Sequence, residues 1–457
     1  MNQSQSEQLD VLFVGEHALW PVDQGFSIRG THIIKAMHNR GVRVAAASID
    51  PIPDEASNQI KSLYLDWPSV NADQTEQFLQ GWSGLGYRAR MRIADYQGRD
   101  LGKFAGIISL VNRYQPKTVI GLGQHSILML RALKQFPNIR KVWYAADELV
   151  YFQLSCMRRE GLSTLSSRLQ KLALYGGLET FFARGLDGAI GVSPFEAKLL
   201  KHLAGAKQST CIRNGVDMDY FTPPTNRPAN KQLVFWGRMD FEPNIDAVTW
   251  FCKKVWPQLH ARHPEATFKI VGKNPNATVN ALAQIPGVEI TGSVPDIRPY
   301  VHSSSATVMP MRCGGGIKNK LLEAAAMGIP IIGSPKAIAG LKSELGEVPI
   351  LVCTNPAMWI SSIEELWSDT VLAKGLEVLL RQWVLAEHCW FNAATEMLNW
   401  LDHLPASNGQ CQQHTPAPGS QTHVSQVSLG QVSQGQVSGD QSSGGHDLNQ
   451  FVNKEAA

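Results

Sequence analysis

Three consecutive glycines, Gly314, Gly315 and Gly316, open the stretch GGGIKNKLLEAAAMGIPII that begins at residue 314. Glycine loses backbone entropy on folding, so a run of three indicates a turn that something must approach closely. The residues after it, IKNKLLEAAAMG, predict a helix that Gly328 closes. Amides at the start of this helix would face a phosphate, and Lys318 would add a full positive charge. The chemistry predicted for the loop is therefore diphosphate binding.

The loop is not a Walker phosphate loop, because each of its lysines is followed by asparagine or leucine, so ATP hydrolysis is not indicated. Glu323 lies about a turn and a half beyond Lys318 in the predicted helix. Its carboxylate could accept hydrogen bonds from a pair of vicinal hydroxyls, such as those of a ribose. The alternative is a solvated helix glutamate, but the apolar AAAMG that follows indicates a packed region.

A second basic position lies upstream, in VFWGRMDFEPNIDAVTWF, where Gly237 and Arg238 follow a predicted strand. Ligands of open α/β sheets bind at the carboxyl ends of the strands. An arginine there can hold a phosphate through two hydrogen bonds. A surface ion pair with Asp240 or Glu242 is an equally good interpretation of Arg238.

One pair of aspartates, Asp217 and Asp219 in RNGVDMDYF, has the D-x-D spacing of a metal site. We expect the first aspartate to fix a turn instead, through hydrogen bonds from its carboxylate to backbone amides. No metal site is predicted.

Two series of short apolar segments must position these residues. The first series is LDVLFVGE, VRVAAAS, KTVIGLG, KVWYAADE and DGAIGVS, and the second is QLVFWGRM, TFKIVGK, VEITGSV, ATVMPMR, IPIIGSP and VPILVCT. Each segment reads as a buried strand, and the amphipathic stretches between them predict helices. The sequence therefore predicts two α/β domains with mainly parallel sheets.

The predicted boundaries follow from these series and from shifts in composition. They are a first domain at 9–205, a connector at 206–230, a second domain at 231–370, a helical segment at 371–404 and a low-complexity tail at 405–457. Tryptophans Trp383, Trp390 and Trp400 of the helical segment are expected to pack in the core. The tail has too few large apolar residues for a core, and we expect it to be disordered.

Composition narrows the class of protein. The chain has 457 residues and a formal net charge of +3, without the dominant basic field of a dedicated nucleic-acid-binding protein. Its seven cysteines never show CxxC spacing, which favours a reducing cytosol over a disulfide framework or a zinc site. The N-terminus does not read as a signal peptide, and no stretch approaches the length of a membrane span. We expect a cytoplasmic protein that could still touch a membrane surface.

Taken together, the motifs resemble those of glycosyltransferase family 4, the retaining, sugar-nucleotide-dependent enzymes of the GT-B fold. The resemblance covers most of residues 9–403 and rests on four ordered motifs: RNGVDMDYF at 213–221, GR at 237–238, TGSVPDIRPYV from 291 and the glycine stretch from 314. The nearer likeness is the branch with a G-x-G-I-K-x-K-x-L-E motif, associated with exopolysaccharide assembly. This implies two Rossmann-like domains facing a central cleft, an acceptor domain and then a nucleotide-sugar domain, with a C-terminal helix returning to the first.

The resemblance also implies a donor site built from both domains. Its donor-binding residues would be Gly25, Gly237, Arg238, Gly314, Gly315, Gly316, Ile317, Lys318 and Glu323. Arg238 and Lys318 would neutralise the donor diphosphate, and Glu323 would hold the ribose. Fixed positive groups would lower the barrier to diphosphate departure, so neither a metal nor another cofactor is expected.

Two departures from the family pattern affect the reaction centre. Gly315 stands where the family commonly has the first glutamate of an E-x7-E motif, which usually contacts the transferred sugar. In the first domain, many members have a histidine where YAADEL places Asp147 and Glu148. Asp147 is the preferred counterpart, and His125 in GLGQHS is the second candidate. Helix capping is the alternative role for Asp147 and His125.

Two further segments of the first domain concern ligands. The first βα turn, GEHALWPVDQGFSIRG, lacks G-x-G-x-x-G, which removes the main support for a nicotinamide site. Arg29 in this turn could contact acceptor or phosphate, or be solvated. The arginine-rich stretch at 86–99 is consistent with a lipid-linked acceptor at the inner leaflet, and a solvated helix face is its alternative.

The sequence thus predicts a cytoplasmic GT-B glycosyltransferase that moves a sugar from a nucleoside diphosphate to a hydroxyl acceptor with retention, in polysaccharide or glycolipid assembly. Its partners would be a nucleotide sugar and a sugar or lipid-linked acceptor, with peripheral contact to the inner membrane and without nucleic acid. One alternative is a GT-B sugar-nucleotide epimerase. Another is a nucleotide-sugar-binding protein without catalytic activity, which Gly315 leaves open.

Overall fold

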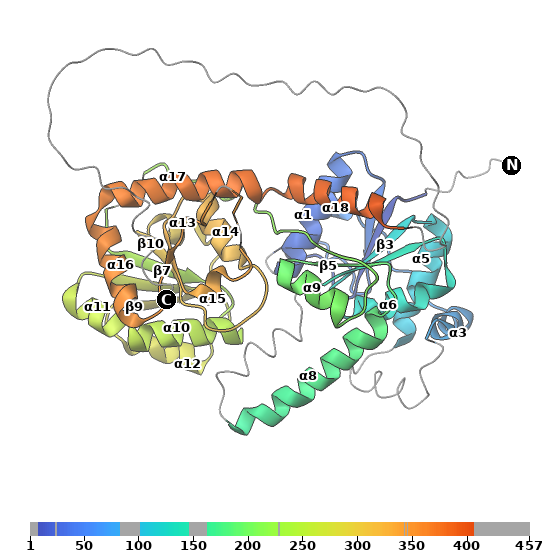
Figure 1. Ribbon diagram of the computed structural model, residues 1–457, viewed down its shortest axis with the longest axis horizontal. Coiled ribbons are helices and arrows are strands. Elements are labelled where there is room, and N and C mark those ends of the chain that lie inside the picture. The colour runs from blue at the N-terminus through green and yellow to red at the C-terminus, as the bar shows by residue number, and fades with distance from the viewer. Residues whose placement is uncertain are drawn as a thin grey trace, which may run out of the picture. The chain divides into compact units, whose positions relative to one another are not determined.

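The computed structural model describes residues 8–22, 25–82, 101–145, 162–226, 229–341, 343–344 and 346–405. The described residues form two parallel six-stranded sheets with helices connecting the strands (Figure 1). This confirms the predicted GT-B architecture of two Rossmann-like domains. Asp147, the arginine-rich stretch at 86–99 and the tail after residue 405 lie outside the described residues.

The first sheet has the strand order β2-β1-β3-β4-β5-β6. Its strands are β1 (Val11–Gly15), β2 (Val44–Ser48), β3 (Thr118–Leu122), β4 (Arg140–Tyr144), β5 (Gly188–Gly191) and β6 (Ser209–Cys211). Strands β1 to β5 coincide with the predicted apolar segments and are buried along nearly their whole length, as strands covered on both faces must be. The edge strand β6 was not predicted, because its sequence STC is short, polar and only half-buried.

The helices of the first domain are α1 (Gly25–Asn39), α2 (Asn58–Lys61), α3 (Ala72–Gln80), α5 (Gly106–Tyr114), α6 (Ser126–Ala132), α8 (Leu162–Ala183) and α9 (Pro194–His202). Short 3-10 helices span Leu101–Ala105 and Leu133–Gln135. Helix α9 begins with a capping box, in which the Ser193 and Glu196 side chains each accept a hydrogen bond from the other residue's backbone amide. This cap fixes α9 directly after β5.

The second sheet has the order β12-β11-β10-β7-β8-β9. Its strands are β7 (Gln232–Trp236), β8 (Thr267–Val271), β9 (Val288–Gly292), β10 (Ala306–Met309), β11 (Ile331–Gly333) and β12 (Leu351–Val352), and each coincides with a predicted segment. The helices are α10 (Glu242–Lys254), α11 (Trp256–Arg262), α12 (Ala277–Asn280), α13 (Arg298–His302), α14 (Asn319–Ala326), α15 (Pro335–Ile338) and α16 (Pro356–Ser368), with a 3-10 helix at Ala281–Gln284. Helix α14 ends just before Gly328, whose φ of 64° lies in the left-handed region, as predicted for a closing glycine.

The C-terminal helices contact both domains. Helix α17 (Thr370–Glu387) packs on α14, and α18 (Trp390–His403) packs on α1 (Figure 1). Trp383 lies in the core of the second domain and Trp390 in the core of the first, as expected, while Trp400 is partly buried. The C-terminal helix therefore returns to the first domain.

Two predictions drawn from composition bear on the described residues. None of the helices described here has both the length and the apolar composition needed to cross a membrane. The described cysteines, Cys211, Cys252, Cys313, Cys353 and Cys389, are free thiols.

Candidate functional site

The glycine loop connects β10 to α14 at the carboxyl end of the second sheet. Gly314 and Gly316 have φ values of 104° and 65°, conformations that residues with a Cβ rarely adopt. Lys318 occupies the N-cap position, so α14 begins one residue later than the lysine. Its ammonium donates hydrogen bonds to the carbonyls of Gly315 and Gly316, the latter at 3.1 Å. In this structure Lys318 therefore stabilises the loop's own backbone.

Lys320 is the second lysine of the loop, and the sequence analysis assigned it no role. Its ammonium donates to Asn244 Oδ1 at 2.8 Å and lies 4.1 Å from the centroid of the Phe235 ring. Burial lowers the pKa of Lys320 to about 7; the charge of Glu323 opposes this shift and that of Lys318 adds to it. The spacing of Lys320 could have identified it from the sequence, because a residue three positions before Glu323 lies on the same face of the helix as Glu323.

Gly237 provides the space for this ammonium. A Cβ at position 237 would lie 2.9 Å from Lys320 Nζ and 2.8 Å from Asn244 Nδ2, and the φ of 147° also disfavours any residue with a side chain. Gly237, which was predicted to bind the donor, is therefore needed at this position because a side chain there would clash with the Lys320 ammonium.

Glu323 is held at the end of β7 rather than solvated. The indole Nε1–H of Trp236 donates to Glu323 Oε2 at 2.8 Å. Burial raises the pKa of Glu323, while the Trp236 hydrogen bond and the charge of Lys320 lower it. One carboxylate oxygen is thus fixed by the last residue of the strand, which orients the group that was predicted to hold a ribose.

Arg238 forms the ion pair that was its alternative interpretation. Its Nε and Nη2 donate to the two carboxylate oxygens of Asp240, each at 3.0 Å. The guanidinium holds the pKa of Asp240 at about 2. The arginine side chain is 44% exposed, so it remains accessible at the carboxyl end of β7.

A chain of polar contacts joins α1 to the glycine-loop helix. The buried Arg29 donates from Nε to Asn214 Oδ1 at 2.8 Å, and Asn214 Nδ2 donates to Asn319 Oδ1 at 2.7 Å. A Cβ built on Gly25, the first residue of α1, would lie 3.6 Å from Asn319 Nδ2. The first residues of α1 and α14 are therefore neighbours, and their positive helix ends lie together. Arg29 is therefore buried in this polar chain rather than solvated.

His125 lies at the carboxyl end of β3, beside the end of β1. Its Nδ1 forms a hydrogen bond with the carboxylate of Glu16, which is only 3% exposed. His125 occupies an N-cap position, but its side chain makes no capping hydrogen bond. The capping alternative is therefore wrong for His125, and its ring is oriented by a buried acid instead.

Asp217 fixes a turn, as predicted. Its Oδ1 accepts hydrogen bonds from the backbone amides of Asp219 at 3.1 Å and Tyr220 at 3.0 Å. Across the described part of the chain, no group of three or more His, Cys, Asp or Glu side chains is arranged to hold a metal ion.

Comparison with known proteins agrees with this geometry. Residues 230–369 match the family model of glycosyl transferases group 1, and this range contains Gly237, Arg238, the glycine loop and Glu323. A search of curated proteins finds no significant match to the sequence.

Solved structures with the same fold cover most of the chain. They include sucrose-phosphate synthase from Thermosynechococcus elongatus (18% identity, TM-score 0.64, covering 87% of this chain and 99% of that one). Anabaena HepE in complex with UDP and glucose has 13% identity and a TM-score of 0.59, covering 87% of this chain and all of that one. TarM has 9% identity and a TM-score of 0.61, covering 87% and 99%. At these identities the likeness establishes the GT-B fold.

Proposed function

We propose that this protein is a retaining glycosyltransferase that transfers a sugar from a nucleoside-diphosphate sugar to a hydroxyl acceptor, in polysaccharide or glycolipid assembly. The observation that carries the proposal is a set of groups at the carboxyl end of the second sheet. There Lys318, Lys320 and Arg238 gather around a glycine loop, with Glu323 oriented beside them. Cations for a diphosphate and a carboxylate for a ribose are the groups that a nucleotide sugar requires.

Each cation has a different part in the proposed donor complex. Lys320 lies against Gly237 and is bonded only to a neutral amide among the contacts described, so a diphosphate would supply the anion that this buried amine lacks. Arg238 would exchange Asp240 for a phosphate oxygen. Lys318 would hold the loop so that its amides and the start of α14 face the diphosphate.

The proposed chemistry is electrostatic. The bond between the anomeric carbon and the diphosphate breaks as the acceptor oxygen bonds to that carbon, and negative charge builds on the departing diphosphate. Fixed cations and helix-end amides stabilise that charge more in the transition state than in the ground state. We propose that the protein's own cations do this without a metal ion.

The acceptor side of the reaction is assigned to the first domain. His125, held by Glu16 at the carboxyl end of the sheet, and Asp147 are the proposed groups near the transferred sugar. A lipid-linked or sugar acceptor is the proposed partner, at the cytoplasmic face of a membrane. UDP in the complex of Anabaena HepE supports a uridine nucleotide as the first donor to test.

Thermal unfolding of the full chain with UDP, GDP, ADP and their sugar conjugates tests the donor site. A ligand that binds only the folded state adds about 2.7 kcal/mol of stability at a hundred times its dissociation constant. We expect one base to stabilise the wild type and the exposed-site control Glu347→Ala fully, and to stabilise Glu323→Ala much less. If no nucleotide raises the unfolding temperature of the wild type, the proposed donor site is wrong.

Product analysis then separates the candidate reactions. Transfer with retention gives a product whose anomeric configuration matches that of the donor, which NMR of the glycoside measures. An epimerase would alter the sugar nucleotide without any acceptor. A binding protein without activity would be stabilised by the nucleotide sugar yet leave it intact.

A further inference from the structure

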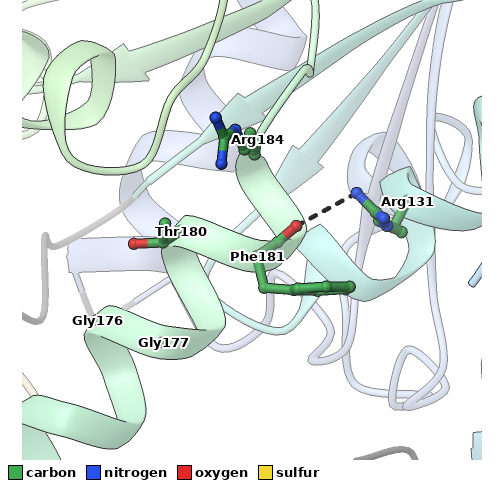
Figure 2. Close-up of a pocket in the computed structure, with 6 residues that line it drawn as sticks. All are labelled: Arg131, Gly176, Gly177, Thr180, Phe181 and Arg184. Carbon is green, nitrogen blue, oxygen red and sulfur yellow. Dashed lines mark hydrogen bonds between the residues drawn. The ribbon is translucent and has the colours of Figure 1, made fainter. Parts of the chain in front are cut away.

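A cavity of about 470 Å³ opens between α6 and α8 of the first domain. It is lined by Arg131, Gly176, Gly177, Thr180, Phe181 and Arg184. Figure 2 shows Arg131 reaching from α6 toward the backbone of Phe181, with Arg184 at the end of α8. A cavity of this size falls within the range of small-molecule sites.

The cavity lies away from the candidate donor site. Helix α6 begins at Ser126, after the carboxyl end of β3, so its last turn with Arg131 lies toward the amino ends of the strands. Arg184 likewise follows the end of α8 and precedes β5. No residue of the glycine loop lines this cavity.

The lining of the cavity is basic, because it includes Arg131 and Arg184 and no acidic residue among those described. Arg131 donates from Nη1 to the Phe181 carbonyl at 3.2 Å and stacks over the Phe181 ring at 4.6 Å, but its buried Nε has no hydrogen-bond partner among the described residues. Burial lowers the pKa of Arg131. The pKa of Lys134 is lowered by burial and by the charges of Arg131 and Lys207.

Among the described residues, no acid lines the cavity. Glu179, the single acid of α8, is buried at 1% exposure. Asp187 accepts hydrogen bonds from Lys207 Nζ at 2.8 Å and from the Lys141 amide at 3.0 Å. A half-buried guanidinium with no acid described beside it is stabilised when an anion binds.

The rest of α8 adds apolar surface beside this basic cavity. Leu169 is 49% exposed and Leu172 is half-buried, whereas Leu174 packs against the core of the first domain. The glycine pair at 176–177 removes two side chains from the helix surface, and a Cβ on Gly177 would meet no atom within 4 Å. Apolar residues next to cationic ones on one helix are typical of surfaces that bind at the membrane interface.

We propose that the cavity between α6 and α8 binds the phosphate of an anionic lipid headgroup and holds the protein at a membrane surface. Arg131 and Arg184 donate to the phosphate oxygens, the space over Gly177 admits the headgroup, and the exposed leucines of α8 enter the interface. The lipid is favoured over a soluble phosphate because these leucines adjoin the cavity. The inference is independent of the proposed sugar transfer, since its readout is membrane binding.

Vesicle sedimentation of the full chain tests this inference, with phosphatidylcholine vesicles that contain or lack phosphatidylglycerol. We expect the wild type to partition onto the phosphatidylglycerol vesicles and the double variant Arg131→Gln/Arg184→Gln to bind about 25-fold less well, since each basic residue near an anionic surface contributes about fivefold. Lys254→Gln, the same charge change on an exposed position of the second domain, serves as the matched control and should bind nearly as the wild type does.

Gly177→Gln tests the cavity without removing a charge or adding an apolar side chain. Glutamine favours a helix more than glycine does, so this variant should fold, and its side chain would fill the open space. We expect it to lose phosphatidylglycerol binding while keeping both arginines. Equal binding to both vesicle types, or full binding by Gly177→Gln and the double variant, overturns the proposal. Binding of glycerol phosphate at the cavity without vesicle binding would also overturn it, because the ligand would then be a soluble phosphate.

Discussion

The carboxyl ends of the two sheets carry different chemistry on nearly the same scaffold. In the second domain three cations, Arg238, Lys318 and Lys320, surround a glycine loop. In the first domain the corresponding edge holds a buried acid bonded to a histidine, Glu16 and His125. Both sheets have six parallel strands, although in different orders, so a parallel sheet does not by itself set this difference. The turns that follow the strands do, and they suit the second domain to an anion.

A similar contrast separates the two lysines of the glycine loop. Lys318 is bonded to its own loop carbonyls, whereas Lys320 is buried against Phe235 and bonded to Asn244. Two residues along the chain therefore separate a lysine that supports the backbone from one that we propose to meet the donor. The first prediction tests whether the anion site depends on the second lysine.

Replacing Lys320 by Met should have the largest effect. Methionine keeps much of the volume and removes the charge, so we expect kcat/KM for the nucleotide sugar to fall about 100- to 1,000-fold, as when one transition-state donor is removed. Lys318→Met is the matched variant in the same loop and should cost less, since Lys318 bonds its own loop. Steady-state kinetics measures both, and a larger loss for Lys318→Met would reverse the assignment.

Substitutions of Glu323 and of its hydrogen-bond partner Trp236 should have the next largest effect. Removing the carboxylate in Glu323→Ala takes away hydrogen bonds to a charged group, and we expect the dissociation constant of the nucleoside diphosphate to rise about 10- to 100-fold. Trp236→Phe keeps a ring but loses the indole donor, so it should raise the constant by about fivefold. Titration calorimetry distinguishes the two. Unchanged affinity in Glu323→Ala would remove the ribose role.

The fold could be predicted from the sequence because parallel strands that are covered on both faces consist of short runs of apolar residues. It missed β6, whose polar STC sequence is held by pairing with β5 rather than by its own apolar character. The turn at Gly314 and Gly316 and the helical position of Glu323 could be predicted because backbone constraints and motif spacing are local. The pairing of Arg238 with Asp240 was one of two alternatives that the sequence left open.

The contacts made by Lys320, Asn244 and Trp236 could not be predicted, because they join segments that are far apart in the sequence. Lys320 comes from α14, Asn244 from α10 and Trp236 from β7. The spacing of Lys320 and Glu323 predicts that both side chains lie on one face of the helix, but it does not predict which residues they contact. The same holds for Glu16 and His125, which become neighbours only because β1 pairs with β3.

The polar chain through Asn214 offers a third test, because it links the first domain to the anion site of the second. Asn214→Leu would leave the buried Arg29 without its amide acceptor, and we expect the free energy of unfolding to fall by about 1–3 kcal/mol. Asn214→Asp should recover much of this, since a carboxylate can accept from both Arg29 and the Asn319 amide. Denaturant unfolding measures the loss, and equal losses in the two variants would show that packing, not the polar chain, matters.

The pH dependence of donor binding should show a modest effect whose direction is fixed by the pKa of Lys320. Because Lys320 has a pKa of about 7 in the folded protein, its charged fraction falls about tenfold between pH 6 and pH 8, and the dissociation constant should rise by a similar factor. A nucleotide sugar is the suitable ligand, since both of its phosphates are esterified and keep their charge. Lys320→Met should abolish this pH dependence, as calorimetry across the range would measure.

Stability should change with pH in the opposite direction. Between about 7 and the ordinary lysine value of 10.5, Lys320 is neutral in the folded chain and charged in the unfolded chain, so the unfolded state binds the additional proton. The free energy of unfolding of the wild type should therefore rise with pH across this window relative to Lys320→Met. A wild type whose donor affinity and stability both rise from pH 7 to pH 9 would contradict the assignment. The cation nearest Gly237 would then not be the group that meets the donor, and the anion site would depend on Arg238 and Lys318 instead.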